Sequence, residues 1–168
     1  RLDKRYQIDR RRWNPGSGGS HGAAFTCAVP AVQLPVALTE TASGGGPTLH
    51  LQIADNLMSA KKNGALEKIQ LQLFFKNCTL QDKIHVRLNG HDLPAVRPAP
   101  FNLVSQWNKN QNRFEGQFIT GTFQYDVGCP PLRQGKNMIQ VQLVQRTPKL
   151  STPLILGMVE AYIKYYGG

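Results

Sequence analysis

The sequence predicts an all-β protein that folds as an antiparallel, jelly-roll-like β-sandwich of about eight strands. Three observations lead to this prediction. Short stretches alternate apolar and polar residues at period two, which indicates strands with one buried and one solvated face. Turn residues separate these stretches at short intervals. Between residues 57 and 66 there is room for one or two helical turns, and no longer amphipathic helix is apparent.

Length and charge point to one basic domain. The chain has 168 residues, of which 40% are apolar, enough for a single core. We expect a basic, flexible arm over residues 1–22 and one β-sandwich domain over residues 23–168. Lys and Arg number 20 against 10 Asp and Glu, a net charge of +10. This balance predicts attraction to polyanions, although scattered surface lysines would give the same number.

The first strands are expected between residues 32 and 76. An edge strand is predicted at 32–38, because Pro30 and Pro35 interrupt this region and proline cannot donate to an interior ladder. A half-buried strand follows at 49–53. The strongest pattern is at 66–76, with apolar residues on one face: Ile69, Leu71, Leu73 and Phe75. Residues 77–82 are expected to turn this strand into a hairpin with residues 83–88.

The second half of the chain repeats the pattern. Residues 84–88 alternate and end in Asn89-Gly90, a pair that tolerates the positive φ angles of a tight hairpin turn. Residues 91–112 contain several prolines and a polar run, and are expected to form a long irregular excursion. The remaining strands are predicted at 117–127, 138–145 and 153–166.

Three motifs carry a resemblance to a known family: Asn89-Gly90 at a strand end, Tyr125-Asp126-Val127, and a turn that reads from Pro131 through Gly135 to Asn137. Over residues 49–166 the chain resembles the galactose-binding-like jelly-roll domains attached to many glycoside hydrolases. It is also similar to the C-terminal β-domain that follows a barrel in some large bacterial hydrolase-like proteins. The resemblance implies a jelly-roll accessory module that is not itself catalytic. Members often hold a structural calcium in loop carboxylates, for which Asp55 and Asp126 are the candidates here.

The predicted excursion supplies the first candidate ligand site. Sugar recognition combines an aromatic face with amide and guanidinium hydrogen bonds, and such residues gather around one tryptophan. The residues expected to bind ligand are Trp107, Asn108, Asn110, Arg97 and Arg113. In the alternative interpretation, this tryptophan caps one open end of the sandwich.

The N-terminal arm supplies a second candidate. Arg10, Arg11, Arg12 and Trp13 are suited to contact a polyanion, with the indole stacking on a sugar or base. The alternative is a solvated arm whose tryptophan packs on the core.

Cysteines and a glycosylation motif favour a secreted protein. Cys27, Cys78 and Cys129 are an odd number, so one intramolecular bridge with a leftover thiol, or an intermolecular bridge, is expected. Asn77-Cys78-Thr79 fits the N-glycosylation pattern. The chain begins at Arg1, which favours a processed N-terminus and an extracellular location. It has no apolar run of membrane-spanning length.

No constellation of catalytic residues stands out. The acidic residues form no recognisable glycosidase pair, and the histidines lack metal-ligand spacing; His50 and His85 fall on outward strand faces. We therefore expect a secreted non-catalytic module, without a cofactor other than the calcium, that binds glycans or another anionic polymer. The alternative is an extracellular matrix protein that self-assembles on an anionic polymer or mineral surface. No nucleic-acid reader motif is present.

Overall fold

The computed structural model describes residues 3–8, 34–42, 44–79, 81–96, 98–108, 113–148 and 151–167, and for 98–108 and 113–121 it describes the backbone alone. Ten strands and one short helix occupy the described residues. Their bounds are β1 Asp3–Ile8, β2 Val36–Leu38, β3 Thr48–Ile53, α1 Leu57–Lys62, β4 Leu66–Cys78, β5 Lys83–Leu88, β6 His91–Asp92, β7 Pro98–Asn108, β8 Arg113–Asp126, β9 Gly135–Gln145 and β10 Leu154–Tyr165.

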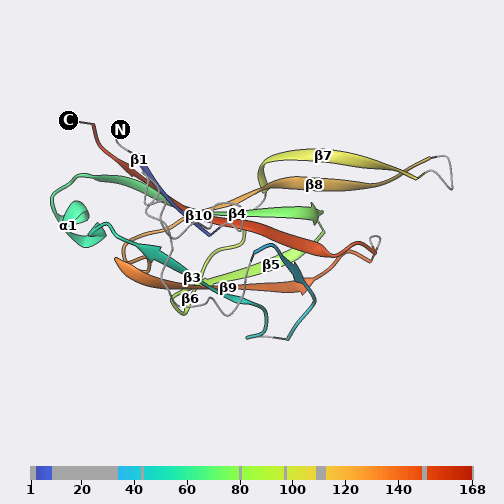
Figure 1. Cartoon of the computed structure of the whole chain (residues 1–168), viewed down its shortest axis with the longest axis horizontal. Helices are drawn as coiled ribbons and strands as arrows, with labels where there is room; N and C mark the ends of the chain where they lie inside the picture. The colour runs from blue at the N-terminus through green and yellow to red at the C-terminus, as the bar shows by residue number, and fades with distance from the viewer. Residues whose placement is uncertain are drawn as a thin grey trace.

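The strands form two antiparallel sheets (Figure 1). Sheet A has six strands in the order β1-β10-β4-β8-β7, with β2 also paired to β10. Sheet B has four strands in the order β3-β9-β5-β6. The chain repeatedly crosses from one sheet to the other, so strands distant in sequence become neighbours. This is a jelly-roll order, and the predicted antiparallel β-sandwich is confirmed.

One hydrophobic core fills the space between the sheets. Ile69 and Leu71 of β4 lie in the same buried cluster as Val86 of β5 and Val141 of β9. Each of these four residues is at most 3% exposed. Burying such a side chain contributes roughly 1.5–3 kcal/mol, so this shared interior is the main source of stability.

The connection after β4 differs from the prediction. The sequence predicts a hairpin between 66–76 and 83–88, but β4 pairs with β10 and β8 in sheet A, whereas β5 pairs with β9 and β6 in sheet B. The predicted hairpin is therefore wrong, and residues 79–82 carry the chain from one sheet to the other. A short polar turn between two alternating stretches occurs both in a hairpin within one sheet and in a crossing between two sheets. Which of the two forms depends on pairing with strands that are distant in the sequence.

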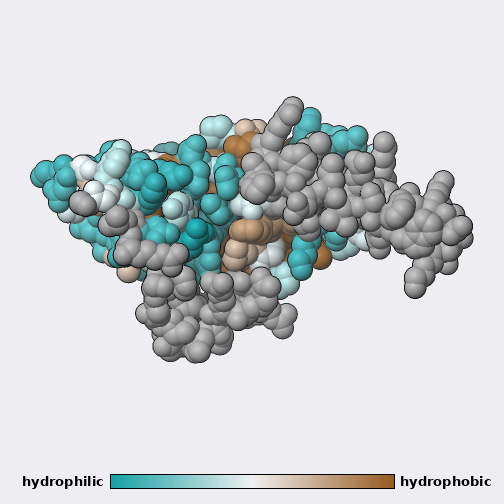
Figure 2. Space-filling view, turned by 90° about the horizontal axis from the view of Figure 1, so that it is seen from above, coloured by the Kyte–Doolittle hydropathy of each residue, from teal (hydrophilic) through white to brown (hydrophobic). Residues whose placement is uncertain are grey.

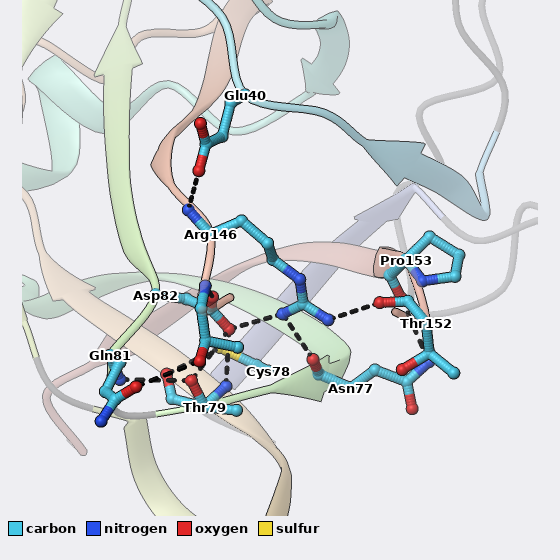
Figure 3. A network of polar contacts seen from close by, with 10 residues as sticks. Glu40, Asn77, Cys78, Thr79, Gln81, Asp82, Arg146, Thr152 and Pro153 are labelled. Atoms are coloured by element: carbon cyan, nitrogen blue, oxygen red, sulfur yellow. Dashed lines mark hydrogen bonds and ion pairs between the residues drawn. The ribbon is translucent and has the colours of Figure 1, made fainter. Parts of the chain in front are cut away.

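A buried ion pair fastens this crossing (Figure 3). Asp82 Oδ2 accepts hydrogen bonds from the backbone N–H of Thr79 at 2.7 Å and from Arg146 Nη1 at 2.6 Å. Its Oδ1 accepts from the N–H of Thr147 at 2.7 Å. Arg146 Nη1 also donates to the carbonyl oxygen of Asn77 at 2.8 Å. The pair thereby joins the β4–β5 crossing to the segment that follows β9.

Asn89-Gly90 forms the predicted tight turn between β5 and β6. The two residues have φ angles of 49° and 82°, as a mirror-image hairpin turn requires. Asn89 Nδ2 donates to Asn137 Oδ1 at 2.8 Å, and Asn89 Oδ1 accepts the N–H of Met138 at 2.8 Å. Two of the motifs that carry the family resemblance are therefore in direct contact, while membership of that family stays a prediction.

The stretch 91–112 contains more regular structure than the sequence predicts. The long irregular excursion is wrong for residues 98–108, which form β7 and pair with β8 as far as Asn108 opposite Arg113. The pairing of β4 with β8 ends at Cys78 opposite Ile119. Residues 113–118 of β8 therefore pair, among the described strands, with β7 alone. This two-stranded ribbon of about 20 Å extends beyond the rest of the sandwich (Figure 1).

The predicted N-terminal arm begins with a strand. Residues 3–8 form β1, which pairs with β10 from Asp3 opposite Lys164 to Ile8 opposite Val159. The proposed polyanion contact at Arg10, Arg11, Arg12 and Trp13 lies outside the described residues.

Candidate functional site

Basic side chains gather on the outer face of sheet B. Side chains alternate between the two faces of a strand, so the residues between the buried positions of β3, β5 and β9 point outward. Five of these outward residues are basic, and we call them the basic face: His50, Lys83, His85, Arg87 and Lys136. Within the four strands of sheet B, Asp92 is the single acidic residue at an outward position.

The strand register places these residues relative to one another. Lys83, His85 and Arg87 follow one another along β5 at intervals of about 6.6 Å. β9 lies between β5 and β3, with Met138 opposite His50. With strands about 4.8 Å apart, His50 lies about 10 Å across the sheet from the β5 row. The basic face is therefore broad enough to contact several anionic groups of one extended ligand.

One carboxylate joins two members of the basic face. Arg87 Nε donates to Asp92 Oδ1 at 2.6 Å, and His85 Nε2 lies 3.1 Å from the same oxygen. The hydrogen bond from Arg87 is the main reason that the pKa of Asp92 lies below its usual range. The Asp92 side chain is 60% exposed. Water and salt therefore weaken this ion pair, and a stronger anionic ligand can compete with it.

His50 is the most enclosed histidine of the basic face. Burial lowers its pKa, and the positive charge of Lys136 on the neighbouring strand lowers it further. Its Nδ1 is buried and has no hydrogen-bond partner among the described residues. Adding a proton to His50 is therefore unfavourable unless a negative charge approaches this part of the face.

Residues 41, 42 and 44 are held against one side of sheet B by two outward amides of β9. Gln142 Nε2 donates to the carbonyl oxygens of Thr41 and Ala42 at 2.9 and 2.8 Å. Gln140 Nε2 donates to that of Gly44 at 2.6 Å. These side chains therefore position a loop, while Met138 on the same strand remains 46% exposed.

On the outer face of sheet A, several of the described charges are paired within the sheet. Glu160 is 2% exposed and accepts hydrogen bonds from Arg5 and Gln7 of β1. Lys164 pairs with Glu67 at 2.9 Å. Two lysines of β4, Lys68 and Lys76, are exposed on sheet A and provide a comparison for the basic face.

The ligand site predicted from sequence is only partly placed. Trp107 and Asn108 lie near the end of β7, opposite Phe114 and Arg113 of β8. Arg97 and Asn110 lie outside the described residues. Three of the five predicted residues, Trp107, Asn108 and Arg113, are thus at the ribbon end, and ligand binding there stays a prediction.

The predicted disulfide is absent among the described residues, because Cys78 and Cys129 are both buried free thiols. Cys129 follows Asp126, which lies opposite Gln70 of β4. Cys78 is eight residues further along that strand, about 26 Å away, whereas bridged Cα atoms lie within about 7 Å. Burial, with a further effect of the Asp82 charge, raises the pKa of Cys78 to about 12. Cys27 lies outside the described residues.

The predicted glycosylation residue, Asn77, is the last but one residue of β4 and lies beside the buried ion pair. Its backbone has a φ of 60° and its Nδ2 donates to the carbonyl oxygen of Pro153 at 3.1 Å. A glycan would replace one of the two Nδ2 hydrogens, and the other can still donate to Pro153. Glycosylation at Asn77 stays a prediction.

The two calcium candidates already have protein partners. Asp55 accepts hydrogen bonds from Lys4 Nζ at 2.7 Å and from the hydroxyls of Tyr6 and Tyr165. Asp126 Oδ1 accepts from Gln70 Nε2 at 3.1 Å. Among the described residues, no three His, Cys, Asp or Glu side chains are grouped so that they could hold a metal ion. A structural calcium stays a prediction.

Asp55 gives the fold a testable dependence on acid. Burial alone would raise its pKa, but hydrogen bonds from Lys4, Tyr165 and Tyr6 outweigh burial and hold the pKa below its usual range. A carboxylate with a lowered folded pKa stabilises the protein above its unfolded pKa of about 3.9, and this stabilisation is lost as the pH falls through the folded pKa.

We therefore expect Asp55→Asn to lower the free energy of unfolding by about 2 kcal/mol at pH 7 and by less below pH 4. Urea unfolding at several pH values measures this. Asp126→Asn, with its single amide partner, serves as the control and should change stability little at either pH. A loss for Asp55→Asn that does not vary with pH would contradict the assigned role.

The visible surface in Figure 2 is hydrophilic over the end of the molecule that carries α1 in Figure 1, with hydrophobic residues nearer the middle. The described part of the chain contains no helix with the length and apolarity needed to cross a bilayer. Comparison of the chain with protein-family models and with curated protein sequences finds no match.

Sequence reasoning found part of this face. His50 and His85 were expected on outward strand positions, which the structure confirms. Lys83 and Arg87 were not chosen as site residues, although they alternate with Ile84, Val86 and Leu88 in the printed sequence. That alternation was the available signal. Lys136 could not be added to them without the order of strands in sheet B.

Proposed function

We propose that this protein is a secreted, non-catalytic module that binds an anionic polysaccharide through the basic face of sheet B. One observation carries the proposal: the outward positions of sheet B hold five basic side chains and a single acidic one. Lysine and arginine supply the charge and donors that sulfate and carboxylate groups need. Exposed Met138 adds an apolar contact for the C–H face of a sugar ring.

The state of the carboxylates supports binding without catalysis. A glycosidase needs a carboxylic acid whose pKa is raised so that it can donate a proton. The pKa values of Asp55 and Asp92 are instead lowered. Asp82 and Glu160 are buried and held by Arg146 and Arg5. Asp55, Asp82 and Glu160 are therefore suited to holding the fold together, and Asp92 is an exposed partner of Arg87 and His85.

Two of the three cysteines give the matrix-protein alternative no support. It drew on an odd cysteine that could link chains, but Cys78 and Cys129 are buried thiols. Burial raises the pKa of both, which disfavours the reactive thiolate. Polysaccharide binding requires no such link and is the better-supported proposal.

The proposal predicts that Lys83→Ala/Arg87→Ala binds dextran sulfate about tenfold more weakly at low salt, because two exposed ion pairs are lost. Asp92→Asn should bind about threefold more tightly, since it frees Arg87 and His85 from a competing carboxylate. Isothermal titration calorimetry measures both effects, and binding of every variant should weaken as salt is added. Uncharged dextran is the comparison ligand.

A matched control separates the basic face from net charge. Lys68→Ala/Lys76→Ala removes the same two charges from exposed positions of β4 in sheet A. This variant should bind within about twofold of the native protein, because the lost charges are on the opposite sheet. Equal losses in the two double variants would contradict a site on sheet B. So would an unchanged affinity in both.

A further inference from the structure

We propose that the basic face binds anionic polysaccharide more tightly as the pH falls from neutral to about 5.5, with His85 and His50 acting as the charge switch. The inference rests on the proposed function and adds a form of regulation to the same site. A module of this kind would hold its ligand firmly in an acidic surrounding and release it at neutral pH.

The geometry gives each histidine a different role. His85 lies in the β5 row between Lys83 and Arg87, with Asp92 Oδ1 3.1 Å from its Nε2 and Gln142 opposite it on β9. Once protonated, it shares Asp92 with Arg87. Part of the positive charge of both residues is then available to a sulfate or carboxylate of the ligand.

His50 belongs to the same face but lacks a carboxylate neighbour in sheet B. The groups around it are Lys136 and Met138 on β9 and Thr48 and Gln52 on its own strand. Its neutral form is favoured in the free protein, because burial and the Lys136 charge both oppose protonation. An anionic ligand lying across β9 would reverse that balance, so binding should draw a proton onto His50.

Proton uptake and ligand binding are therefore coupled, and the coupling acts in both directions. Lowering the pH favours the protonated histidines, which bind the polyanion more tightly. The bound polyanion in turn favours the protonated histidines. With ligand bound and both histidines protonated, the face would carry five positive charges, whereas Lys83, Arg87 and Lys136 alone give three, against the single negative charge of Asp92.

The test is calorimetric titration of dextran sulfate into the full chain at pH 7.5 and 5.5, at constant ionic strength. We expect affinity to rise about tenfold at the lower pH, because two added charges each contribute the modest energy of an exposed ion pair. His50→Gln/His85→Gln should lose most of this increase between pH 7.5 and pH 5.5. Repeating the titrations in buffers of different ionisation enthalpy should show proton uptake on binding for the native protein and little for the variant.

His91→Gln is the matched control. His91 lies on the same β5–β6 hairpin, but it is opposite the buried Leu88 and so on the other side of the ribbon from Arg87 and Asp92. Its variant should retain the full increase. An equal increase in the double histidine variant, or no increase in the native protein, would overturn the switch while leaving the proposed function standing. Absence of binding at both pH values would overturn both.

Discussion

Asp82→Ala is expected to lower the free energy of unfolding by about 3–5 kcal/mol, because it leaves the Arg146 guanidinium largely buried without its counter-charge. The Asp82 side chain is fully buried and that of Arg146 is 14% exposed. The variant also removes the acceptor for the backbone N–H groups of Thr79 and Thr147. Urea unfolding followed by circular dichroism measures the loss.

The exposed pair of Asp92 with Arg87 is the matched control for this experiment. It has the same 2.6 Å separation between nitrogen and carboxylate oxygen, yet its side chains are 60% and 41% exposed. Asp92→Ala should therefore cost far less stability than Asp82→Ala. If both variants cost the same, burial is not what makes the Asp82 pair important.

Asp82→Ala combined with Arg146→Met adds a second check. Removing both charges leaves neither one unpaired, so the double variant should lose less stability than the sum of the two single variants. Additive losses would contradict direct coupling between Asp82 and Arg146. If Asp82→Ala had the same free energy of unfolding as the native protein, the ion pair would not stabilise the fold.

This ion pair also shows why strand pairing could not be predicted from local sequence. Alternation correctly placed β4 and β5, since burial on one face leaves its mark at every second residue. Whether they pair with each other depends on partners far along the chain. Arg146, 64 residues from Asp82, takes part in fixing the crossing. The local sequence at residues 77–82 gives no indication that Arg146 is the partner.

The prediction of an irregular excursion at 91–112 was wrong for a different reason. Proline at 98 and 100 and the polar run near residue 110 are typical of loops, but the prolines begin β7 and the polar run follows it. The turn signals therefore marked the ends of the element correctly. The alternation in between was too short and mixed to outweigh them.

The basic face lies between these two cases. Its β5 row could be predicted, because Lys83, His85 and Arg87 alternate with apolar residues over one strand. The approach of His50 and Lys136 could not, since it depends on β9 lying between β3 and β5. A binding surface built across a sheet becomes visible only when the strand order is known.

The second large effect is expected at Asn137, which is fully buried at the start of β9. Its Oδ1 accepts hydrogen bonds from the N–H of Arg133 at 3.0 Å and from Asn89 Nδ2 at 2.8 Å. Its Nδ2 donates to the carbonyl oxygens of Arg133 and Gly135 at 2.8 and 3.1 Å. One side chain thus closes the turn before β9 and joins it to the turn between β5 and β6.

Asn137→Leu should therefore lower the free energy of unfolding by about 3–4 kcal/mol, because several buried polar groups lose their partners together.

Asn137→Asp should destabilise the protein more at pH 8 than at pH 5. The carbonyl oxygens of Arg133 and Gly135 repel a carboxylate and would raise its folded pKa, so the penalty grows as the pH rises above the unfolded value. Gln134→Ala, which removes an exposed amide from the same turn, should cost less than about 1 kcal/mol. Denaturant unfolding of the three variants at both pH values decides the matter, since a pH-independent loss for Asn137→Asp would show that its carbonyl neighbours do not hold the side chain as described.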